Sequence, residues 1–263
     1  MSRTEIEPVL SVVIPAYNEE SRIEPSLERV RAFLEGRGES AEVLVVDDGS
    51  SDDTSRVVEA EMARYRASGL DLRLLGDGAN HGKGAAVRTG MLAARGHVVL
   101  FSDADLSAPI EEAPKLIDPI LAGATDIAIG SRGLDKSLIG VHQSAGREYA
   151  GRFFNLLMRT VTGMPFRDTQ CGFKAFRRDA TRNIFSRVRI ERFGFDVEVL
   201  YLARKLGYEV QEVPVIWNNV EGSKVSLMGG LNGYLDLLRV RWNDMRGRYD
   251  GKTSARSIST IAD

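Results

Sequence analysis

The sequence predicts an α/β fold in which a mostly parallel sheet is flanked by helices, formed by a single domain over residues 1–250. Short apolar runs of strand length alternate with longer segments whose apolar residues recur every three or four positions, the spacing of a helix. Strands that alternate with helices pair in parallel. Polar residues gather directly after the expected strands, where such sheets bind ligands. Residues 251–263 are small and polar and are expected to be a flexible tail.

The first half contains the clearest alternation. A nearly continuous apolar run, typical of a strand buried on both faces, lies at 9–14. Further strands are expected at 42–46, 70–75, 97–101 and 126–129. Asn18 is suited to cap the first helix, whose apolar positions run from Ile23 to Leu34. A second helix is expected after the turn that ends at Thr54, and two more over 82–94 and 109–121.

The second half is less regular. Helices are expected over 145–161, 179–185, 195–206 and 227–245, and a strand over 208–217. The helices 145–161 and 227–245 are amphipathic, with arginines beside an apolar face. Such faces suit either a membrane surface, bound reversibly, or ordinary packing against the domain.

Composition excludes several classes of protein. With 43% hydrophobic and 27% charged residues, the chain is neither disordered nor fibrous. The single cysteine, Cys171, rules out a disulfide framework and a cysteine-rich zinc site. There is no apolar run of about eighteen residues and the N-terminus is acidic and polar, so we expect neither a transmembrane helix nor a secretory signal. A cytoplasmic location follows as the default.

The net charge of −2 hides an uneven distribution. Residues 1–130 contain 13 Lys and Arg against 23 Asp and Glu, whereas residues 131–192 contain 13 against 5. A basic middle beside an acidic first half fits either a site for an anionic ligand or a solvated face with scattered arginines. The basic segment has no nucleic-acid recognition motif and the pI is near 6.0, so no nucleic-acid partner is expected.

Two aspartates one residue apart, Asp103 and Asp105, follow the fourth expected strand. Hard oxygen ligands in this arrangement suit Mg²⁺ or Mn²⁺, which completes its shell with phosphate and water and would neutralise a leaving diphosphate. Asp-x-Asp triplets are common in turns, but the position at the end of a buried strand strengthens the prediction.

Asp47 and Asp48 follow the second expected strand. Asp readily caps helices and forms turns, and we expect Asp47 to be the more structural of the two and Asp48 to reach a ligand. The glycine-rich stretch Gly78–Gly84 resembles a phosphate-cradling loop. It has neither the P-loop spacing nor the dinucleotide fingerprint, which argues against a dehydrogenase.

Five motifs of the first half resemble family 2 glycosyltransferases of the Rossmann-like GT-A fold. They are Val12-Val-Ile-Pro-Ala-Tyr-Asn-Glu-Glu20, Val45-Val-Asp-Asp-Gly-Ser-Ser-Asp-Asp-Thr54, Gly82-Lys-Gly-Ala-Ala-Val-Arg-Thr-Gly90, Asp103-Ala-Asp-Leu-Ser-Ala-Pro109 and Gly130-Ser-Arg132. Three further motifs are similar to the dolichyl-phosphate β-glucosyltransferase branch, a neighbour of the dolichyl-phosphate mannose synthases. They are Arg167-Asp-Thr-Gln-Cys-Gly-Phe-Lys-Ala-Phe176, Glu191-Arg-Phe-Gly-Phe-Asp-Val-Glu198 and Glu221-Gly-Ser-Lys224.

The resemblance implies a metal-dependent, inverting transfer of glucose from UDP-glucose to a polyprenyl phosphate of the dolichyl type, by a peripheral protein on the cytoplasmic face of a membrane. Residues 8–132 would bind the nucleotide and residues 133–250 the acceptor. Asn218, Asn219 and Val220 stand where mannose synthases often carry arginine, which fits UDP-glucose better than GDP-mannose. Mannosyl transfer from GDP-mannose, hexosyl transfer to a hydroxyl, and nucleotide-sugar binding without catalysis are the alternatives.

The site residues of the family carry over motif by motif. The residues implied to line the uridine pocket are Pro15, Ala16, Tyr17, Glu19, Val46 and Asp48. Those implied beside the nucleotide and diphosphate are Lys83, Ala104 and Lys224. The implied metal ligands are Asp103, Asp105 and Ser107, where Ser107 replaces a Gln common in mannose synthases. Arg132 and Arg147 are implied to contact sugar or phosphate through their guanidinium forks.

Asp196 lies about where family 2 enzymes place their catalytic base. A hydroxyl acceptor needs such a base, whereas a phosphate monoester is already ionised at neutral pH. With a phosphate acceptor, Asp196 would orient the sugar or a neighbouring Lys or Arg, and capping of a helix is the structural alternative. The candidates for holding the acceptor phosphate are Arg147, Arg167, Lys174 and Arg192. A local salt bridge between Arg167 and Asp168 is the competing interpretation there.

Overall fold

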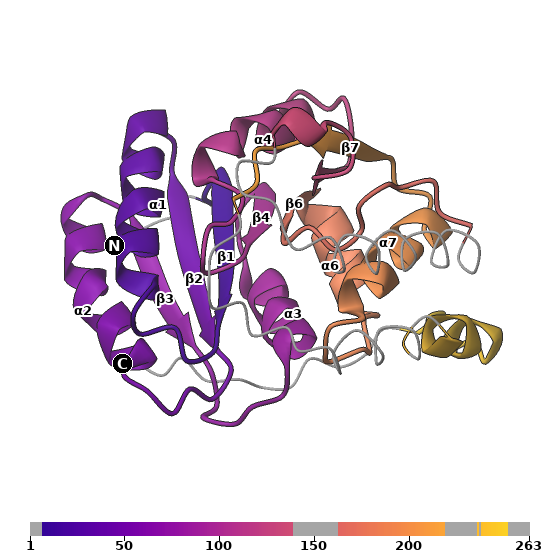
Figure 1. The fold of residues 1–263 in the computed structure, drawn as a ribbon, viewed down its shortest axis with the longest axis horizontal. Coiled ribbons are helices and arrows are strands. Elements are labelled where there is room, and N and C mark those ends of the chain that lie inside the picture. Colours follow the sequence, from indigo (N-terminus) through magenta and orange to yellow (C-terminus); the bar gives the residue numbers. More distant parts are fainter. Residues whose placement is uncertain (1–6, 139–162, 219–235, 237, 252–263) are drawn as a thin grey trace, which may run out of the picture.

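The computed structural model describes residues 7–138, 163–218, 236 and 238–251 (Figure 1). Among these residues a seven-stranded sheet has the order β3-β2-β1-β4-β6-β5-β7. The strands are β1 Leu10–Ala16, β2 Ala41–Asp47, β3 Asp71–Leu75, β4 Val98–Ser102, β5 Ile127–Ser131, β6 Phe173–Arg177 and β7 Val210–Pro214. The helices are α1 Ile23–Arg37, α2 Thr54–Ala67, α3 Lys83–Ala93, α4 Pro114–Leu121, α6 Arg178–Phe185 and α7 Phe195–Lys205, with the short 3-10 helices η1 Ile110–Glu112 and η2 Lys136–Leu138. A further helix covers 238–245.

The expected α/β arrangement with a mostly parallel sheet is confirmed. Every strand runs in the same direction except β6, which pairs antiparallel with β4 on one side and β5 on the other. The sequence did not predict β6. Lys174 stands at its centre and interrupts the apolar run, although it is buried like its neighbours Phe173 and Ala175.

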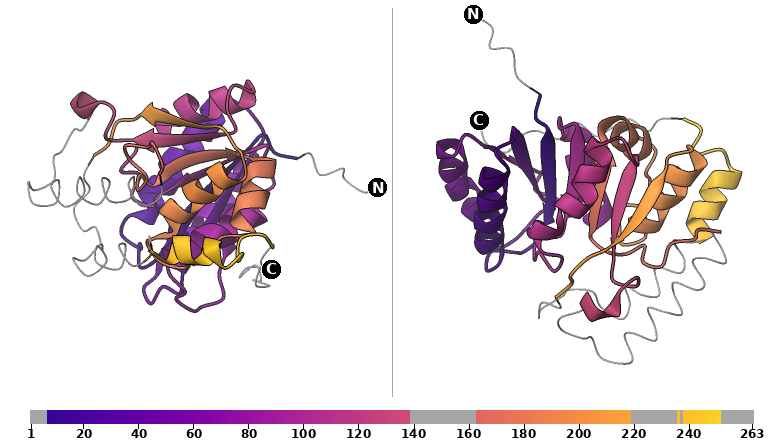
Figure 2. Two further views of the ribbon diagram at one scale, coloured as in Figure 1. Left: turned by 90° about the vertical axis from the view of Figure 1, so that its right-hand side faces the viewer. Right: turned by 90° about the horizontal axis from the view of Figure 1, so that it is seen from above.

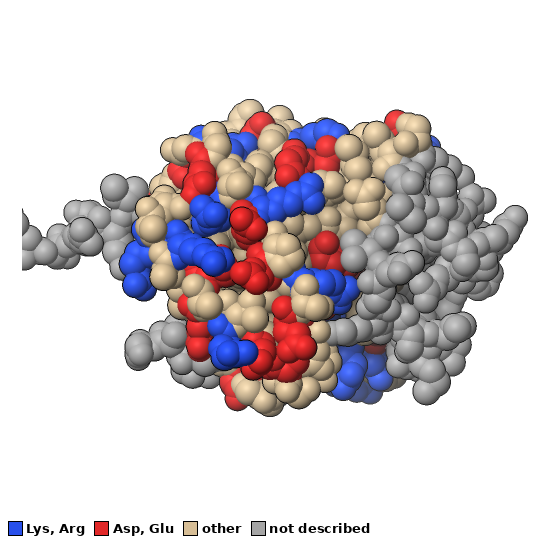
Figure 3. All heavy atoms as spheres, turned by 60° about the vertical axis from the view of Figure 1, so that its left-hand side comes forward, with Lys and Arg blue, Asp and Glu red and all other residues tan. Residues whose placement is uncertain are grey.

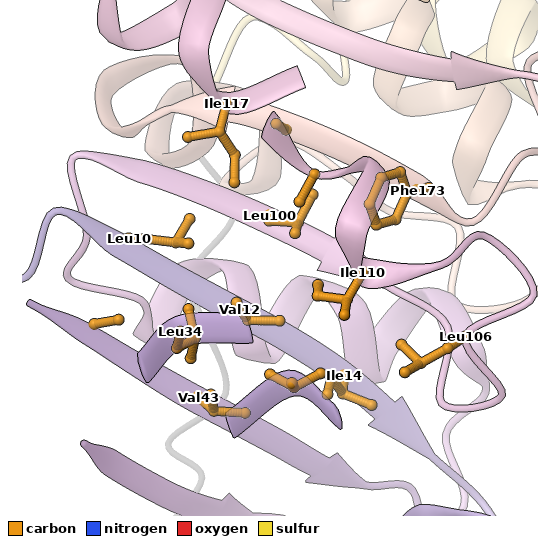
Figure 4. Close-up of a cluster of buried hydrophobic side chains, with 14 of the residues drawn as sticks. Leu10, Val12, Ile14, Leu34, Val43, Leu100, Leu106, Ile110, Ile117 and Phe173 are labelled. Atoms are coloured by element: carbon orange, nitrogen blue, oxygen red, sulfur yellow. The ribbon is translucent and has the colours of Figure 1, made fainter. Parts of the chain in front are cut away.

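Helices cover both faces of the sheet and enclose two apolar cores. One core lies between the sheet and the helices α1, α2 and α4, and the other between the sheet and α3, α6 and α7. All seven residues of β1 are buried, and Figure 4 shows Leu10, Val12 and Ile14 among side chains from neighbouring strands and helices. Burial of an aliphatic side chain of this size stabilises the fold by about 1.5 to 3 kcal/mol.

The sheet brings the predicted polar clusters together. The chain leaves β1 for β2 and β3 on one side, and then returns to form β4 on the other side of β1. In β1 and β2 the last paired residues are Ala16 and Asp47, so both strands end at the same edge. A reversal of strand order at this edge is where open α/β sheets bind their ligands.

The helix boundaries differ from expectation in two places. The helix expected over 109–121 is divided into η1 and α4, and Pro114 stands at the first position of α4, where its missing N–H is tolerated. Asn18 does not cap α1, which begins at Ile23. It has a positive φ of 53°, and its side-chain oxygen accepts a hydrogen bond from the N–H of Ser51, so it joins the loops after β1 and β2.

The helix 238–245 lies beside α7 (Figure 2). Val240 and Tyr249 are buried in the core that α7 helps to form. The expected helix 145–161, and the part of the expected helix 227–245 before residue 238 apart from Asp236, lie outside the described residues.

The face that carries α1 and α2 has acidic and basic side chains interspersed (Figure 3). Ion pairs on this side of the molecule include Arg31–Glu35 within α1, Arg56–Asp53 at the start of α2 and Arg29–Glu111 between α1 and η1. The excess of acidic residues in the first half therefore does not form one continuous negative patch on this face.

Candidate active site

The Asp103–Asp105 pair stands in a tight turn directly after β4. The N–H of Leu106 donates to the carbonyl of Asp103 at 3.1 Å, and Leu106 has a positive φ of 46°, rare for a branched side chain. The Asp105 carboxylate accepts the N–H of Ser107 at 2.9 Å. Strained backbone of this kind is typical of functional sites. The turn holds both carboxylates at the carboxyl edge of the sheet, as the sequence predicted.

Gly172 packs directly against the Asp103 carboxylate. The carbonyl of Gly172 accepts the N–H of Asp103 at 3.1 Å. A Cβ atom at position 172 would lie 2.0 Å from Oδ2 of Asp103, so only glycine fits there. This contact explains the glycine of the motif that contains Cys171 and Lys174.

Lys83 stands at the start of α3 and reaches the same carboxylate. Its Nζ lies 2.6 Å from Oδ1 of Asp103. Burial opposes the charge on Lys83, but the carboxylates of Asp103 and Asp196 outweigh burial and raise its pKa. Lys83 therefore lies beside Asp103, and its contact with a diphosphate stays a prediction.

Asp48 holds the turn that precedes Lys83. Its carboxylate accepts the N–H groups of His81 at 2.8 Å and Gly82 at 2.9 Å. Burial raises the pKa of Asp48, and these two hydrogen bonds act in the opposite direction. Asp47 accepts hydrogen bonds from Ser50 within its own turn, so its structural role is confirmed. A role for Asp48 in contacting a base stays a prediction.

The other residues implied to line the uridine pocket surround the same edge. Pro15, Ala16 and Val46 form the ends of β1 and β2, and Tyr17 follows with 41% of its surface exposed. Glu19 pairs with Arg22 at 2.7 Å. A cavity of about 290 Å³ lies behind the turn that contains His81, and its lining includes Asp48, Arg88 and Glu191.

A buried ion pair joins β6 to α7. The Nζ of Lys174 lies 2.5 Å from Oδ1 of Asp196 and donates to the carbonyl of Cys171 at 2.6 Å. Burial raises the pKa of Asp196, and Lys174 and Lys83 offset part of that rise. Lys83 and Lys174 both lie over the ring of Phe101, at 5.7 Å and 5.9 Å from its centre.

This pairing corrects two expectations. Lys174 is 1% exposed and its ammonium is engaged, so it is not placed to hold an acceptor phosphate. Asp196 does not cap α7, because Gly194 occupies the cap position and Asp196 lies within the first turn. Burial also raises the pKa of the Cys171 thiol to about 12, which fits the expected packed residue.

Arg132 is held in one orientation by Asp168 and Trp217. Its Nε and Nη2 donate to the two carboxylate oxygens of Asp168 at 2.6 Å and 2.9 Å. The guanidinium carbon lies 5.3 Å from the centre of the Trp217 ring. Burial would raise the pKa of Asp168, but Arg132 outweighs burial and holds the pKa below its ordinary value. The hydrogen atoms on Nη1 remain on the side of the guanidinium away from Asp168.

The alternative of a salt bridge between Arg167 and Asp168 is therefore wrong, because both carboxylate oxygens of Asp168 accept hydrogen bonds from Arg132. The N–H groups of Arg167 and Asp168 both donate to Glu212, which fixes this segment beside β7. The side chains of Arg167 and Arg192 are exposed. Arg147 and Lys224, which the sequence also assigned to the site, lie outside the described residues.

The carboxylate oxygens of Asp103 and Asp105 suit a divalent cation that takes only a few of its ligands from the protein. Among the described residues there is no group of three or more His, Cys, Asp or Glu side chains that could hold a metal ion. Asp103 and Asp105 supply hard carboxylate oxygens, and Oδ1 of Asp103 lies 2.6 Å from the ammonium of Lys83. Mg²⁺ and Mn²⁺ take such a pair and fill the remaining positions with phosphate oxygens and water. Whether Ser107 is a third ligand stays a prediction.

Sequence reasoning missed the partners that fix the charged groups. Two of these partners, Asp168 and Gly172, stand in the motif Arg167–Phe176, and Trp217 precedes Asn218. No local sequence pattern indicates which residues they contact. Glu198 closes one of the motifs and is fully buried with no role assigned to it from the sequence. The candidate site residues were predicted because they follow strands. The residues that hold them in place come from elements that meet only in the folded chain.

Comparison with known proteins yields one family and several relatives. Residues 11–185 match the model of Glycosyl transferase family 2. The dolichyl-phosphate beta-glucosyltransferase of Drosophila melanogaster is 40% identical over 228 residues, which are 82% of this chain and 69% of the relative. The human protein of the same name is 36% identical over 252 residues, 91% of this chain and 76% of the relative.

Solved structures with the same fold include an enzyme of Mycobacterium tuberculosis. Glucosyl-3-phosphoglycerate synthase in complex with phosphoglyceric acid has a TM-score of 0.62 and 23% identity, covering 89% of this chain and 80% of that one. The same enzyme in complex with Mn²⁺, UDP-glucose and phosphoglyceric acid has a TM-score of 0.60 and 21% identity, covering 89% and 79%. At this identity the likeness establishes the fold alone.

Proposed function

The chain belongs to glycosyltransferase family 2, and we propose that it transfers glucose from UDP-glucose to dolichyl phosphate or a related polyprenyl phosphate. The chain is a glycosyltransferase, and its GT-A fold is the expected one. Relatives at 35% to 40% identity are named for β-glucosyl transfer to dolichyl phosphate, which supports the sugar and the acceptor. The proposed reaction inverts the anomeric carbon in one displacement.

The observation that carries the choice of acceptor is the Lys174–Asp196 pair. A general base must be within reach of the proton it removes and must be free to accept it. Oδ1 of Asp196 is bound to Lys174, and the side chain is 8% exposed. A phosphate monoester is ionised near neutral pH and attacks without a base. The geometry therefore favours a phosphate acceptor over a hydroxyl acceptor.

The remaining charged groups fit a reaction between two phosphate compounds. Lys83 and Arg132 bring positive charge to the carboxyl edge of the sheet, where the diphosphate of the donor and the phosphate of the acceptor would meet. The fork of Arg132 suits phosphate oxygens because its direction is fixed by Asp168. A divalent cation, Mg²⁺ or Mn²⁺, bound by Asp103 and Asp105 would neutralise the leaving diphosphate.

A lipid-linked acceptor also requires access to a membrane surface. Among the described residues, no helix is long and apolar enough to cross a bilayer. The helix 238–245 exposes Leu238, Trp242 and Met245 at 61%, 51% and 70%, on one side of the helix. Arg241 and Arg246 are exposed beside them, and Arg246 lies over the Trp242 ring. This combination supports reversible contact with a bilayer carrying anionic lipids, on its cytoplasmic face.

The deciding experiment measures transfer of labelled sugar into an organic phase. Purified protein is incubated with Mn²⁺, a short polyprenyl phosphate, and UDP-glucose or GDP-mannose in parallel. We expect a lipid product from UDP-glucose only. A product from GDP-mannose alone would contradict the proposed donor. Release of UDP without a lipid product would contradict the phosphate acceptor and favour a hydroxyl acceptor.

A further inference from the structure

The motif from Glu191 to Glu198 connects two distant parts of the molecule. Glu198 is 0% exposed, and one of its carboxylate oxygens accepts the N–H groups of Arg189 at 2.9 Å and Ile190 at 2.8 Å. The other oxygen accepts the hydroxyl of Tyr249 at 2.7 Å. Tyr249 is 1% exposed and comes from the segment that follows the helix 238–245. A buried carboxylate with three donors is a fixed structural point.

The loop that Glu198 holds lies against the start of α3. The N–H of Ala85 donates to the carbonyl of Glu191 at 3.0 Å. A Cβ at Gly82 would lie 2.6 Å from the carbonyl oxygen of Glu191, and a Cβ at Gly84 would lie 2.6 Å from that of Ile190. The two glycines therefore let the loop approach the backbone on both sides of Lys83.

Two further contacts join the C-terminal segment to the loop and to the residues just before it. The Nε of Arg189 donates to the carbonyl of Arg248 at 2.9 Å, and the Nε of Arg187 donates to the carbonyl of Tyr249 at 3.1 Å. A series of contacts thus runs from Tyr249 to Glu198, from Glu198 to the loop, and from the loop to Gly82 and Gly84 on either side of Lys83. The ammonium of Lys83 lies 2.6 Å from Asp103 at the far end of this connection.

We propose that Glu198 and Tyr249 are positioning residues for Lys83, so that the C-terminal segment sets the geometry of the donor site. Neither residue touches the carboxylates at the end of β4. They act by fixing the loop 189–192, which in turn fixes the backbone of Gly82 and Gly84. This inference rests on the proposed function for the part that Lys83 plays toward a diphosphate.

The test compares two substitutions that each remove one phenol hydroxyl from a carboxylate. Tyr249→Phe breaks the bond to Glu198. Tyr201→Phe is the matched control, because Tyr201 donates to Asp244 at 2.5 Å and so also joins α7 to the C-terminal segment, but its hydroxyl bonds Asp244 and Arg241 and not Glu198. Two quantities are measured for each variant: amide hydrogen exchange of residues 82–86 without ligand, and the KM values for donor and acceptor.

For Tyr249→Phe we expect faster exchange at residues 82–86 and a KM for UDP-glucose raised about fivefold to tenfold, the size of one lost buried hydrogen bond. The KM for polyprenyl phosphate should not change, and Tyr201→Phe should alter neither quantity. Unchanged exchange in Tyr249→Phe, or the same change in both variants, would overturn the proposal. Glu198→Gln, which keeps the size of the side chain and removes its charge, provides a second variant with the same expectation if Tyr249→Phe folds poorly.

The two readouts separate this proposal from the proposed function. Exchange at residues 82–86 is measured without substrate, so it reports the connection whatever the enzyme transfers. Faster exchange with no use of UDP-glucose would overturn the proposed donor and retain the positioning role. Normal exchange with active glucose transfer would overturn the positioning role and retain the donor.

Discussion

The ammonium of Lys174 lies 2.5 Å from a carboxylate oxygen of Asp196, and the two side chains are only 2% and 8% exposed. Lys174 comes from the one strand that runs against the rest of the sheet, and Asp196 from the first turn of α7. A buried pair of this kind gives little net stability over an apolar pair, but removing one partner leaves an uncompensated charge. Its chief effect is to fix the Asp196 carboxylate beside Phe101 and Lys83.

Lys174→Met should therefore destabilise the protein by about 3 to 5 kcal/mol at pH 7. Burial raises the pKa of Asp196 in the folded protein, and loss of Lys174 removes an opposing influence. The folded variant then binds a proton more tightly than the unfolded chain, whose Asp pKa is about 3.9. Its free energy of unfolding should rise as the pH falls from 7 toward 5. Urea denaturation at several pH values measures this slope.

The double variant Lys174→Met/Asp196→Leu is the control for that slope. It removes both charges from the buried site, so it should recover much of the stability and lose the added pH dependence. A single variant whose stability is independent of pH between 5 and 7 would show that Asp196 is not the group left uncompensated.

Removal of the metal should stop the reaction. EDTA is expected to abolish sugar transfer and Mn²⁺ to restore it, because Asp103 and Asp105 leave most of the coordination positions to phosphate and water. Asp105→Asn should lower turnover on the order of a hundredfold, in line with the loss of one electrostatic contact to a leaving group. Asp53→Asn is the control. It removes the carboxylate of an exposed ion pair with Arg56 and should retain full turnover. Full activity in EDTA would contradict the metal assignment.

Arg132→Lys should weaken acceptor binding while retaining the charge. A lysine cannot form both hydrogen bonds to Asp168 or stack on Trp217. We expect the KM for polyprenyl phosphate to rise about tenfold, with a loss of roughly 1 to 3 kcal/mol in stability because Asp168 stays buried with fewer donors. Steady-state kinetics with each substrate varied in turn measure the first effect and thermal unfolding the second. An increase confined to the KM for UDP-glucose would instead place Arg132 at the donor.

The sequence was sufficient to predict most strands and the polar edge of the sheet. Buried parallel strands appear as apolar runs, and Asp48, Asp103 and Asp105 follow such runs directly, so fold and polar edge were both predicted. Strand β6 was missed because Lys174 breaks its run, and its burial depends on Asp196, which is 22 residues away. A local pattern cannot show that a charged residue will meet its partner from another element.

The same limit applies to the other pairs of charged and polar side chains. Arg132 and Asp168 are 36 residues apart, and Glu198 and Tyr249 are 51 residues apart. From the sequence, a salt bridge between Asp168 and its neighbour Arg167 was the alternative to a phosphate-binding role for Arg167. The folded structure excludes that salt bridge because β5 brings Arg132 to Asp168, while the backbone of Arg167 is turned toward Glu212.

Contact with a membrane depends in this proposal on the exposed apolar side of the helix 238–245. Trp242→Ser should reduce binding to vesicles of phosphatidylcholine and phosphatidylserine by about tenfold, because burial of one large apolar side chain contributes about 1.5 to 3 kcal/mol. Cosedimentation with vesicles measures the bound fraction. Leu121→Ser is the matched control, since Leu121 is 42% exposed at the end of α4, away from this helix, and should leave binding unchanged.

Equal loss of vesicle binding in both variants, or no binding by the unaltered protein, would contradict the proposed membrane-contacting surface. Transfer to a water-soluble short-chain polyprenyl phosphate should survive Trp242→Ser, because the side chain serves access to the lipid and not the reaction itself.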